Sequence, residues 1–410
     1  MRSLITAPRL FTGLDHTFID RGAVLVERDR IVAAGRESDI GVVDGPVARF
    51  HIPDGTIVPG LIDGHTHLTC SASDRMVADA FEDDDLTATI RATDHAHAAL
   101  RAGITTLRDC GSRHRVVNRL REAIRLGITK GPRLLLSGSV ITTTGGHMYF
   151  VGREVDDPLE LPRAVREQVR AGADFIKVTN TGGGLVPGNG TAYLQFDRKA
   201  LRLIIDEATQ LGVHVAVHSL STDGIAEVVE ARPRTVEHLT FHKNSDEEIA
   251  YDGGLVDRLV ERGLPGCQVI VGWHRRAHAA LGCLREDVEP ATLQQLENRI
   301  KVLQDMRSRG LQFIAGSDAG MPRTWFDNLG LILDLSVRHI GMSPAQSLLS
   351  ATRDAAHAFG LDDRGVLTPG RLADVSVLRG DPFVDSEAFY GSVLTMVGGK
   401  VLWKPEEAGA

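Results

Sequence analysis

Two histidines separated by one residue follow the first strongly apolar run of the chain. His65 and His67 end a stretch that begins at Ile57 and is interrupted by Pro59 and Gly60. In extended backbone, residues i and i+2 project to the same side, so two imidazoles can face one ion. Neutral imidazole is a good zinc ligand, but two histidines supply only half of a four-coordinate site. The pair alone leaves metal binding and a structural role equally open.

A second pair with the same spacing receives the opposite interpretation. His95 and His97 lie within residues 86–103, which are rich in Ala, Leu and Arg and are predicted to form a helix. On a helix, residues i and i+2 do not face each other, so these two imidazoles cannot share an ion. We interpret them as surface residues.

Four further side chains of ligand type, Lys177, His218, His238 and Asp318, lie where short apolar strands are predicted to end. Each histidine alone is better explained as a hydrogen-bonded core residue, and Asp318 alone as the cap of a turn. Lys177 is different, because both faces of a parallel strand are buried and an unpaired buried ammonium is costly. A lysine in that position needs a partner or a chemical modification.

The elements that would position these residues alternate regularly from residue 57 onward. Amphipathic helices that end at glycine separate the run before His65 from seven later apolar strands at 104–108, 133–137, 174–178, 213–218, 235–238, 266–271 and 312–317. Eight strand–helix units over this length predict an α/β fold of the (β/α)8 TIM-barrel type. The carboxyl ends of such strands meet at one rim, where catalytic residues cluster. The six candidate ligands are therefore predicted to converge.

The two chain ends have a different texture, with short strands separated by tight turns. Residues 1–56 and 365–410 both read as small antiparallel segments, and 57–364 contain the barrel pattern. We expect both ends to build one small β-sandwich domain into which the barrel is inserted.

Composition limits the classes of partner. The net charge of −8 argues against a nucleic-acid-binding surface, and no apolar run approaches the length of a membrane span. The four cysteines form no Cys-x-x-Cys pair, and the first residues lack the pattern of a secretory signal. We therefore expect a cytoplasmic protein without nucleic-acid or membrane partners. A small-molecule substrate and a homo-oligomeric state are also predicted, on grounds other than composition.

The joint pattern resembles a known family over nearly the whole chain. His65-Thr66-His67, Lys177, His218, His238 and Asp318 resemble the ligands of the amidohydrolase superfamily, binuclear-metal subtype. The segments 105–109, 142–147 and 175–178 are similar to the branch that holds imidazolonepropionase-like proteins, prolidase-type dipeptidases and ochratoxin-hydrolysing enzymes.

This resemblance implies two divalent metal ions, with Zn²⁺ as the first choice, bridged by an N-carboxylated Lys177. His65, His67 and Asp318 would hold one ion, and His218 and His238 the other. Carboxylation would turn the buried amine into an anionic oxygen ligand, which removes the cost of a buried ammonium.

The chemistry implied is metal-dependent amide hydrolysis. Two cations lower the pKa of a bridging water, and the resulting hydroxide attacks the carbonyl of a small amide. Asp318 would act as general base and then acid, and His147 in a glycine-rich loop would steady the oxyanion or the substrate. For His147, an exposed loop histidine is an equally good interpretation. Trp273, His274 and Arg323 are the remaining candidates for substrate contact.

Two alternative functions match parts of this pattern. A mononuclear deaminase or cyclic-imidate hydrolase of the same superfamily commonly lacks the strand-four lysine and carries His-x-x-Glu after strand five, whereas His218 is followed by Ser219-Leu220-Ser221. A non-catalytic scaffold is disfavoured because the ligand set is complete. The substrate stays open among N-acyl amino acids, dipeptides, aryl amides and carbamate-like compounds; dipeptidases of the branch often show His-Ala-Tyr at this position, which this chain lacks.

Overall fold

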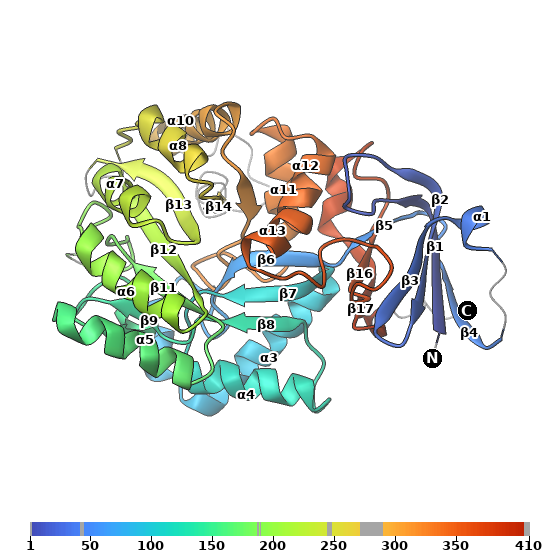
Figure 1. Cartoon of the computed structure of the whole chain (residues 1–410), viewed down its shortest axis with the longest axis horizontal. Helices are drawn as coiled ribbons and strands as arrows, with labels where there is room; N and C mark the ends of the chain where they lie inside the picture. The colour runs from blue at the N-terminus through green and yellow to red at the C-terminus, as the bar shows by residue number, and fades with distance from the viewer. Residues whose placement is uncertain are drawn as a thin grey trace.

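A computed structural model describes residues 2–41, 45–186, 188, 190–243, 248–270 and 290–405. Figure 1 shows two parts, an α/β body and a sheet formed from both chain ends. A search of the described residues finds no helix with the length and apolar character needed to cross a membrane.

The body is built on short buried strands that pair in parallel. They are β6 (Leu61–Thr66), β7 (Ile104–Asp109), β8 (Arg133–Leu136), β9 (Val140–Thr142), β10 (Gly152–Glu154), β11 (Phe175–Thr179), β12 (His214–Ser221), β13 (Thr235–His242), β14 (Gly266–Gln268) and β15 (Phe313–Ala315). All the strands predicted after residue 57 are present within a few residues of the expected bounds.

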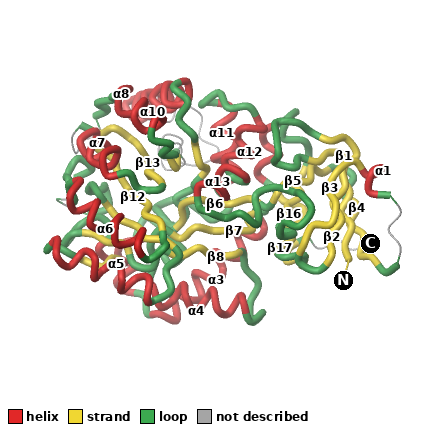
Figure 2. The backbone as a smooth tube through the Cα atoms, in the orientation of Figure 1, coloured by secondary structure: helices red, strands yellow, loops and turns green. Residues whose placement is uncertain are grey.

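Helices separate these strands and lie outside them (Figure 2). The helices are α2 (Met76–Glu82), α3 (Asp85–Arg101), α4 (His114–Arg125), α5 (Leu161–Arg170), α6 (Arg198–Gln210), α7 (Thr222–Ala231), α8 (Gly253–Glu261), α10 (Pro290–Ser308), α11 (Leu329–Arg338), α12 (Pro344–Ser350) and α13 (Arg353–Ala358), with 3-10 turns η1 (Tyr149–Val151) and η2 (Pro158–Glu160).

The body is TIM-barrel-like, but its described strands do not form one continuous hydrogen-bonded ring. They form a sheet of order β6-β7-β8 and a second of order β10-β9-β11-β12-β13-β14-β15. The two sheets are joined by single hydrogen bonds: Asp318 N donates to His65 O (2.8 Å) and His67 N to Ala319 O (2.7 Å) at one seam, and Asp174 N to Leu136 O (2.7 Å) at the other. The fully closed ladder expected from the sequence is therefore interrupted at both seams.

Helix α3 shows why the predicted helices form. The Asp84 side chain accepts from Thr87 N at the first turn, and buried alanines recur along one face at 88, 92, 96 and 99. This spacing of three to four residues gives a small apolar stripe that packs against the sheet. The two histidines on α3, interpreted from the sequence as surface residues, are half-buried rather than fully exposed. His95 stacks on Phe326, with ring centroids 4.2 Å apart, and His97 Nε2 lies 3.0 Å from Thr129 Oγ1.

Both chain ends contribute to a second structural unit, the end sheet. Its eight strands are β1 (Arg2–Leu10), β2 (Ile19–Glu27), β3 (Arg30–Arg36), β4 (Val47–His51), β5 (Gly55–Pro59), β16 (Val375–Arg379), β17 (Ser392–Val397) and β18 (Lys400–Trp403); α1 (Glu37–Ile40) and η4 (Ser386–Tyr390) connect them. The eight strands belong to one sheet. The two-layered sandwich and the domain limits at residues 56 and 364 stay predictions.

Gly60 alone separates β5 of the end sheet from β6 of the body. A Cβ at this position would lie 2.2 Å from Thr105 Oγ1 and 2.8 Å from Thr105 Cβ. Such distances are far inside van der Waals contact, so the passage between the two units requires glycine.

We predict that Gly60→Ala lowers the free energy of unfolding by about 1–3 kcal/mol, the usual cost of overpacking a core. Thermal and denaturant unfolding of the full chain measure this effect. Gly35→Ala in β3 is the matched control, because a Cβ there meets no atom within 4 Å. Equal stability of the two variants would contradict the proposed close approach.

Candidate active site

A cavity of about 480 Å³ opens where the parallel strands end. Its wall contains all six side chains predicted as metal ligands: His65, His67, Lys177, His218, His238 and Asp318. They come from the ends of β6, β11, β12 and β13 and from the segment after β15. The structure thus brings together residues spread over more than half of the chain.

Three of these side chains form a compact donor group. His65 Nε2 lies 3.5 Å and His67 Nε2 3.3 Å from Asp318 Oδ1. The other nitrogen of each ring is already engaged, because His65 Nδ1 contacts Glu237 Oε2 at 2.8 Å and His67 Nδ1 contacts Gly111 O at 2.7 Å. Partners on the outer nitrogen fix the ring and direct the inner nitrogen to a metal, which is the usual arrangement around metal-binding histidines. This donor set fits a divalent ion.

Lys177 is buried beside this group. Its Nζ lies 3.1 Å from His65 Nε2, and among the described residues this is the hydrogen-bond partner found for its side chain. The structure confirms the burial of Lys177 that the sequence predicts. An ammonium with one imidazole as its partner is an unfavourable state for a fully buried group.

His218 and His238 extend the cluster across the cavity. Their ring centroids are 4.5 Å apart, and those of His238 and His65 are 5.0 Å apart. Burial, followed by the effect of neighbouring histidines, lowers the pKa of both well below the ordinary value. Burial also lowers the pKa of His65 to about 4. The rings are therefore neutral at pH 7, as ligation by imidazole requires.

Asp318 supplies a negative charge beside these neutral histidine rings. Burial alone would raise the pKa of its carboxyl group, but His65 and His67 hold that pKa well below its usual range. Its backbone is left-handed, with φ of 60°. Non-glycine residues in this region cost free energy and concentrate at functional sites, where the surrounding structure holds them.

His147 faces the cavity and is 8% exposed. Its ring centroid lies 4.4 Å from that of His218, and its Nδ1 has no hydrogen-bond partner among the described residues. Burial lowers its pKa to about 3. This nitrogen is itself covered by protein atoms, so the part of His147 that can meet a bound substrate is the remainder of the ring that lines the cavity.

Of the other residues predicted to contact the substrate, the structure describes one. Arg323 lies at the rim, where its Nε and a terminal nitrogen donate to Asp74 at 2.8 and 3.0 Å. Its guanidinium is therefore already paired with a carboxylate. Trp273 and His274 lie outside the described residues.

Sequence reasoning missed the buried charged residues that support the ligands. Arg299 on α10 is buried and donates to the main-chain oxygens of His238 and Leu239, both of which are left-handed with φ of 72° and 52°. Arg108 on β7 and Glu237 on β13 are also buried and contact each other. Two opposite charges on predicted buried strands were the available signal, since each needs a partner.

Comparisons with known proteins show similarity over most of the chain. The model of the Amidohydrolase family matches residues 56–402. Ochratoxinase of Aspergillus niger is 26% identical over 407 residues, covering 90% of this chain and 80% of that protein. Imidazolonepropionase of Pyrobaculum arsenaticum is 23% identical, covering 91% and 92%.

A solved structure is similar over the whole length. A Xaa-Pro dipeptidase with methionine bound in its active site superposes with a TM-score of 0.85 at 25% identity, covering 99% of this chain and 100% of that one. The match to the family model extends over most of the chain and includes all six candidate ligands. The chain therefore belongs to the amidohydrolase family, and it is a metal-dependent hydrolase that acts on C–N bonds.

Proposed function

We propose that this amidohydrolase binds two divalent ions, Zn²⁺ as the first choice, and cleaves a small amide. The observation that carries the proposal is the convergence of six donor side chains on one cavity. His65, His67 and Asp318 would hold one ion, and His218 and His238 the other. Imidazole and carboxylate donors are those that zinc accepts.

An N-carboxylated Lys177 would be the bridge between the two ions. Its amine would attack carbon dioxide, lose a proton and become a carbamate, which offers two anionic oxygens. The burial of Lys177 beside His65 Nε2 supports this modification, since the carbamate replaces an ammonium that has little compensation there. The same lysine favours the binuclear site over a mononuclear deaminase or cyclic-imidate hydrolase.

The protein side chains then divide the remaining work. When bound, the ions would polarise the substrate carbonyl and lower the pKa of water. Asp318, ionised and at the edge of the cavity, takes a proton from the attacking water and returns it to the leaving nitrogen. His147 donates a hydrogen bond to the developing oxyanion or orients the substrate.

The cavity favours a compact substrate. A volume of about 480 Å³ suits a small molecule, and apolar side chains form part of the wall: Val140, Met148, Leu185, Val269 and Met321. We propose an N-acyl amino acid, a dipeptide, an aryl amide or a carbamate-like compound. The relatives support the range rather than one member, since they are named as an ochratoxinase, an imidazolonepropionase and a Xaa-Pro dipeptidase. The cytoplasmic location and the homo-oligomeric state stay predictions.

Metal analysis of the purified protein tests the centre. We expect about two divalent ions per chain, the number required by a bridged site. Lys177→Ala should lose metal and activity together, because it removes the bridge. Bicarbonate with a short carboxylic acid should restore part of both. Lys199→Ala, at an exposed lysine on α6, is the control and should keep full metal content. A wild-type protein with one ion or none would contradict the binuclear centre.

His147→Ala separates the two interpretations of that residue. If His147 steadies the oxyanion, kcat should fall about 10²–10³-fold, the usual loss on removing one such donor. Metal content should be unchanged, because His147 is not a proposed ligand. Steady-state kinetics on an aryl amide or N-acyl amino acid substrate, with metal analysis of the same sample, measures both. An unchanged kcat would favour a loop histidine without a catalytic role.

A further inference from the structure

Arg108 is a buried cation below the floor of the cavity. Its guanidinium lies over the rings of Phe175 and Phe359, 4.2 and 4.3 Å from their centroids, and the residue is 2% exposed. It donates to Glu237 Oε1 (3.1 Å), Thr235 Oγ1 (3.1 Å) and Gly64 O (3.3 Å). A buried ion pair contributes little net stability compared with apolar packing, so its presence calls for another reason.

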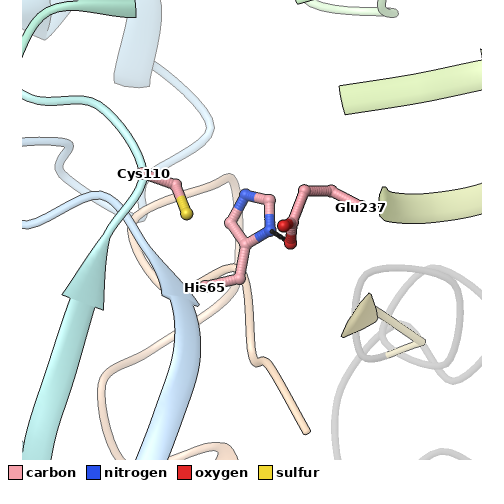
Figure 3. A group of neighbouring side chains, drawn as sticks. All are labelled: His65, Cys110 and Glu237. Atoms are coloured by element: carbon pink, nitrogen blue, oxygen red, sulfur yellow. Dashed lines mark hydrogen bonds and ion pairs between the residues drawn. The ribbon is translucent and has the colours of Figure 1, made fainter. Parts of the chain in front are cut away.

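Glu237 links this cation to the metal centre. Glu237 is fully buried, and its two carboxylate oxygens have different partners. Oε1 accepts from Arg108 and from the Thr235 hydroxyl (2.7 Å), and Oε2 lies 2.8 Å from His65 Nδ1. Figure 3 shows the Glu237 carboxylate directed at this nitrogen of the His65 ring.

The contact determines which nitrogen of His65 is free. An ionised carboxylate can accept a hydrogen bond but cannot donate one, so Nδ1 of the neutral ring must carry the hydrogen and be the donor. The lone pair then lies on Nε2, the atom 3.1 Å from Lys177 Nζ and 3.5 Å from Asp318 Oδ1. His67 obtains the same orientation from a main-chain oxygen, Gly111 O. His65 is thus the member of the pair that depends on a charged side chain.

Cys110 invites a different interpretation, which the contacts disfavour. Its thiol, His65 and Glu237 lie close enough to hold an ion, with ligand atoms within 4.8 Å of one another (Figure 3). However, both oxygens of Glu237 are already engaged by Arg108, Thr235 and His65. An ion there would have to displace those partners, so the group supports a ligand rather than forming a separate site.

We propose that Glu237, held by Arg108, is a positioning residue that fixes the orientation and tautomer of His65 so that Nε2 faces the metal. This inference rests on the proposed metal centre. This role explains the presence of the buried ion pair, since the guanidinium holds the carboxylate in the orientation that faces Nδ1.

Glu237→Gln tests the proposal with little change in size. The amide must turn its NH2 group either toward Arg108, where two donors oppose each other, or toward His65 Nδ1. The second orientation selects the tautomer with hydrogen on Nε2, which cannot bind metal. We expect the Kd for Zn²⁺ to rise about 10–100-fold, the usual effect of removing such a partner.

The measurement is the Zn²⁺ Kd of the full chain, obtained by competition with a chromophoric chelator. The rise in Tm on adding zinc to the metal-free protein gives a second readout, since it depends on the same Kd. Glu237→Asp keeps the charge next to Arg108 but shortens the side chain by one methylene. It should also weaken zinc binding, with less effect on the Tm of the metal-free protein, and it serves if Glu237→Gln does not fold.

Asp374→Asn is the matched control. Asp374 is a buried carboxylate that accepts two hydrogen bonds from Arg133, at 2.8 and 3.2 Å, in a contact between the end sheet and β8. Its loss should lower stability without changing the Kd for zinc. An equal Kd in Glu237→Gln and the wild type, or an equal weakening in Asp374→Asn, would overturn the inference. A wild type that binds no zinc would instead contradict the proposed metal centre.

Discussion

The carboxylate of Asp63 holds together the first and last parallel strands, and the active site depends on that junction. Its Oδ1 accepts from His65 N (3.2 Å) and Ser317 N (3.0 Å), and its Oδ2 accepts from the Ser317 hydroxyl at 2.5 Å. Burial raises the pKa of Asp63 to about 6. Because β6 and β15 share no continuous ladder, this side chain and the two main-chain hydrogen bonds at the seam, Asp318 N to His65 O and His67 N to Ala319 O, together set the approach of Asp318 to the two histidines.

Close packing completes the junction. A Cβ on Gly316 would lie 2.6 Å from Cys267 Sγ and 2.9 Å from His65 Cβ, so this position accepts only glycine. Buried side chains also position other ligands around the cavity. Arg299 holds the main chain at His238, and the Arg108–Glu237 pair holds the ring of His65. The ligands are therefore positioned by buried polar groups behind them. Arg108 and Glu237 offset the cost of desolvation by pairing with each other, whereas Arg299 donates to main-chain oxygens and its Nε has no partner among the described residues.

The parts of this molecule that the sequence predicts are those governed by periodicity. Strand ends follow from alternating apolar segments, and the convergence of Lys177, His218 and Asp318 follows because parallel strands end at a common rim. The supporting contacts are not visible in the sequence, since Arg108 and Glu237 are separated by 129 residues and their contact depends on side-chain conformation.

The differences between the sequence interpretation and the structure also arise from contacts between residues far apart in the sequence. On α3, His95 contacts Phe326 and Leu68 O, and on another face His97 contacts Thr129; helical periodicity cannot foresee these contacts with other segments. The barrel ladder is interrupted where β6 meets the segment after β15 and where β8 meets the segment before β11, and isolated main-chain hydrogen bonds join the two sheets there, which apolar periodicity cannot foresee. Arg323 is a candidate for substrate contact from the sequence, and its pairing with Asp74 is visible only in the structure.

The place of β5 in the end sheet has a consequence for biosynthesis. One edge of β5 pairs with β1, and the other pairs with β16, whose residues Val375–Arg379 are near the end of the chain. A ribosome completes every strand of the body before β16 exists, so the nascent protein exposes an unpaired edge next to the strand that carries His65. The last metal ligand, Asp318, is also synthesised before that edge is covered. All the metal ligands are therefore synthesised before the strand that covers this sheet edge. Protection of the edge can occur only after nearly all of the protein has been made.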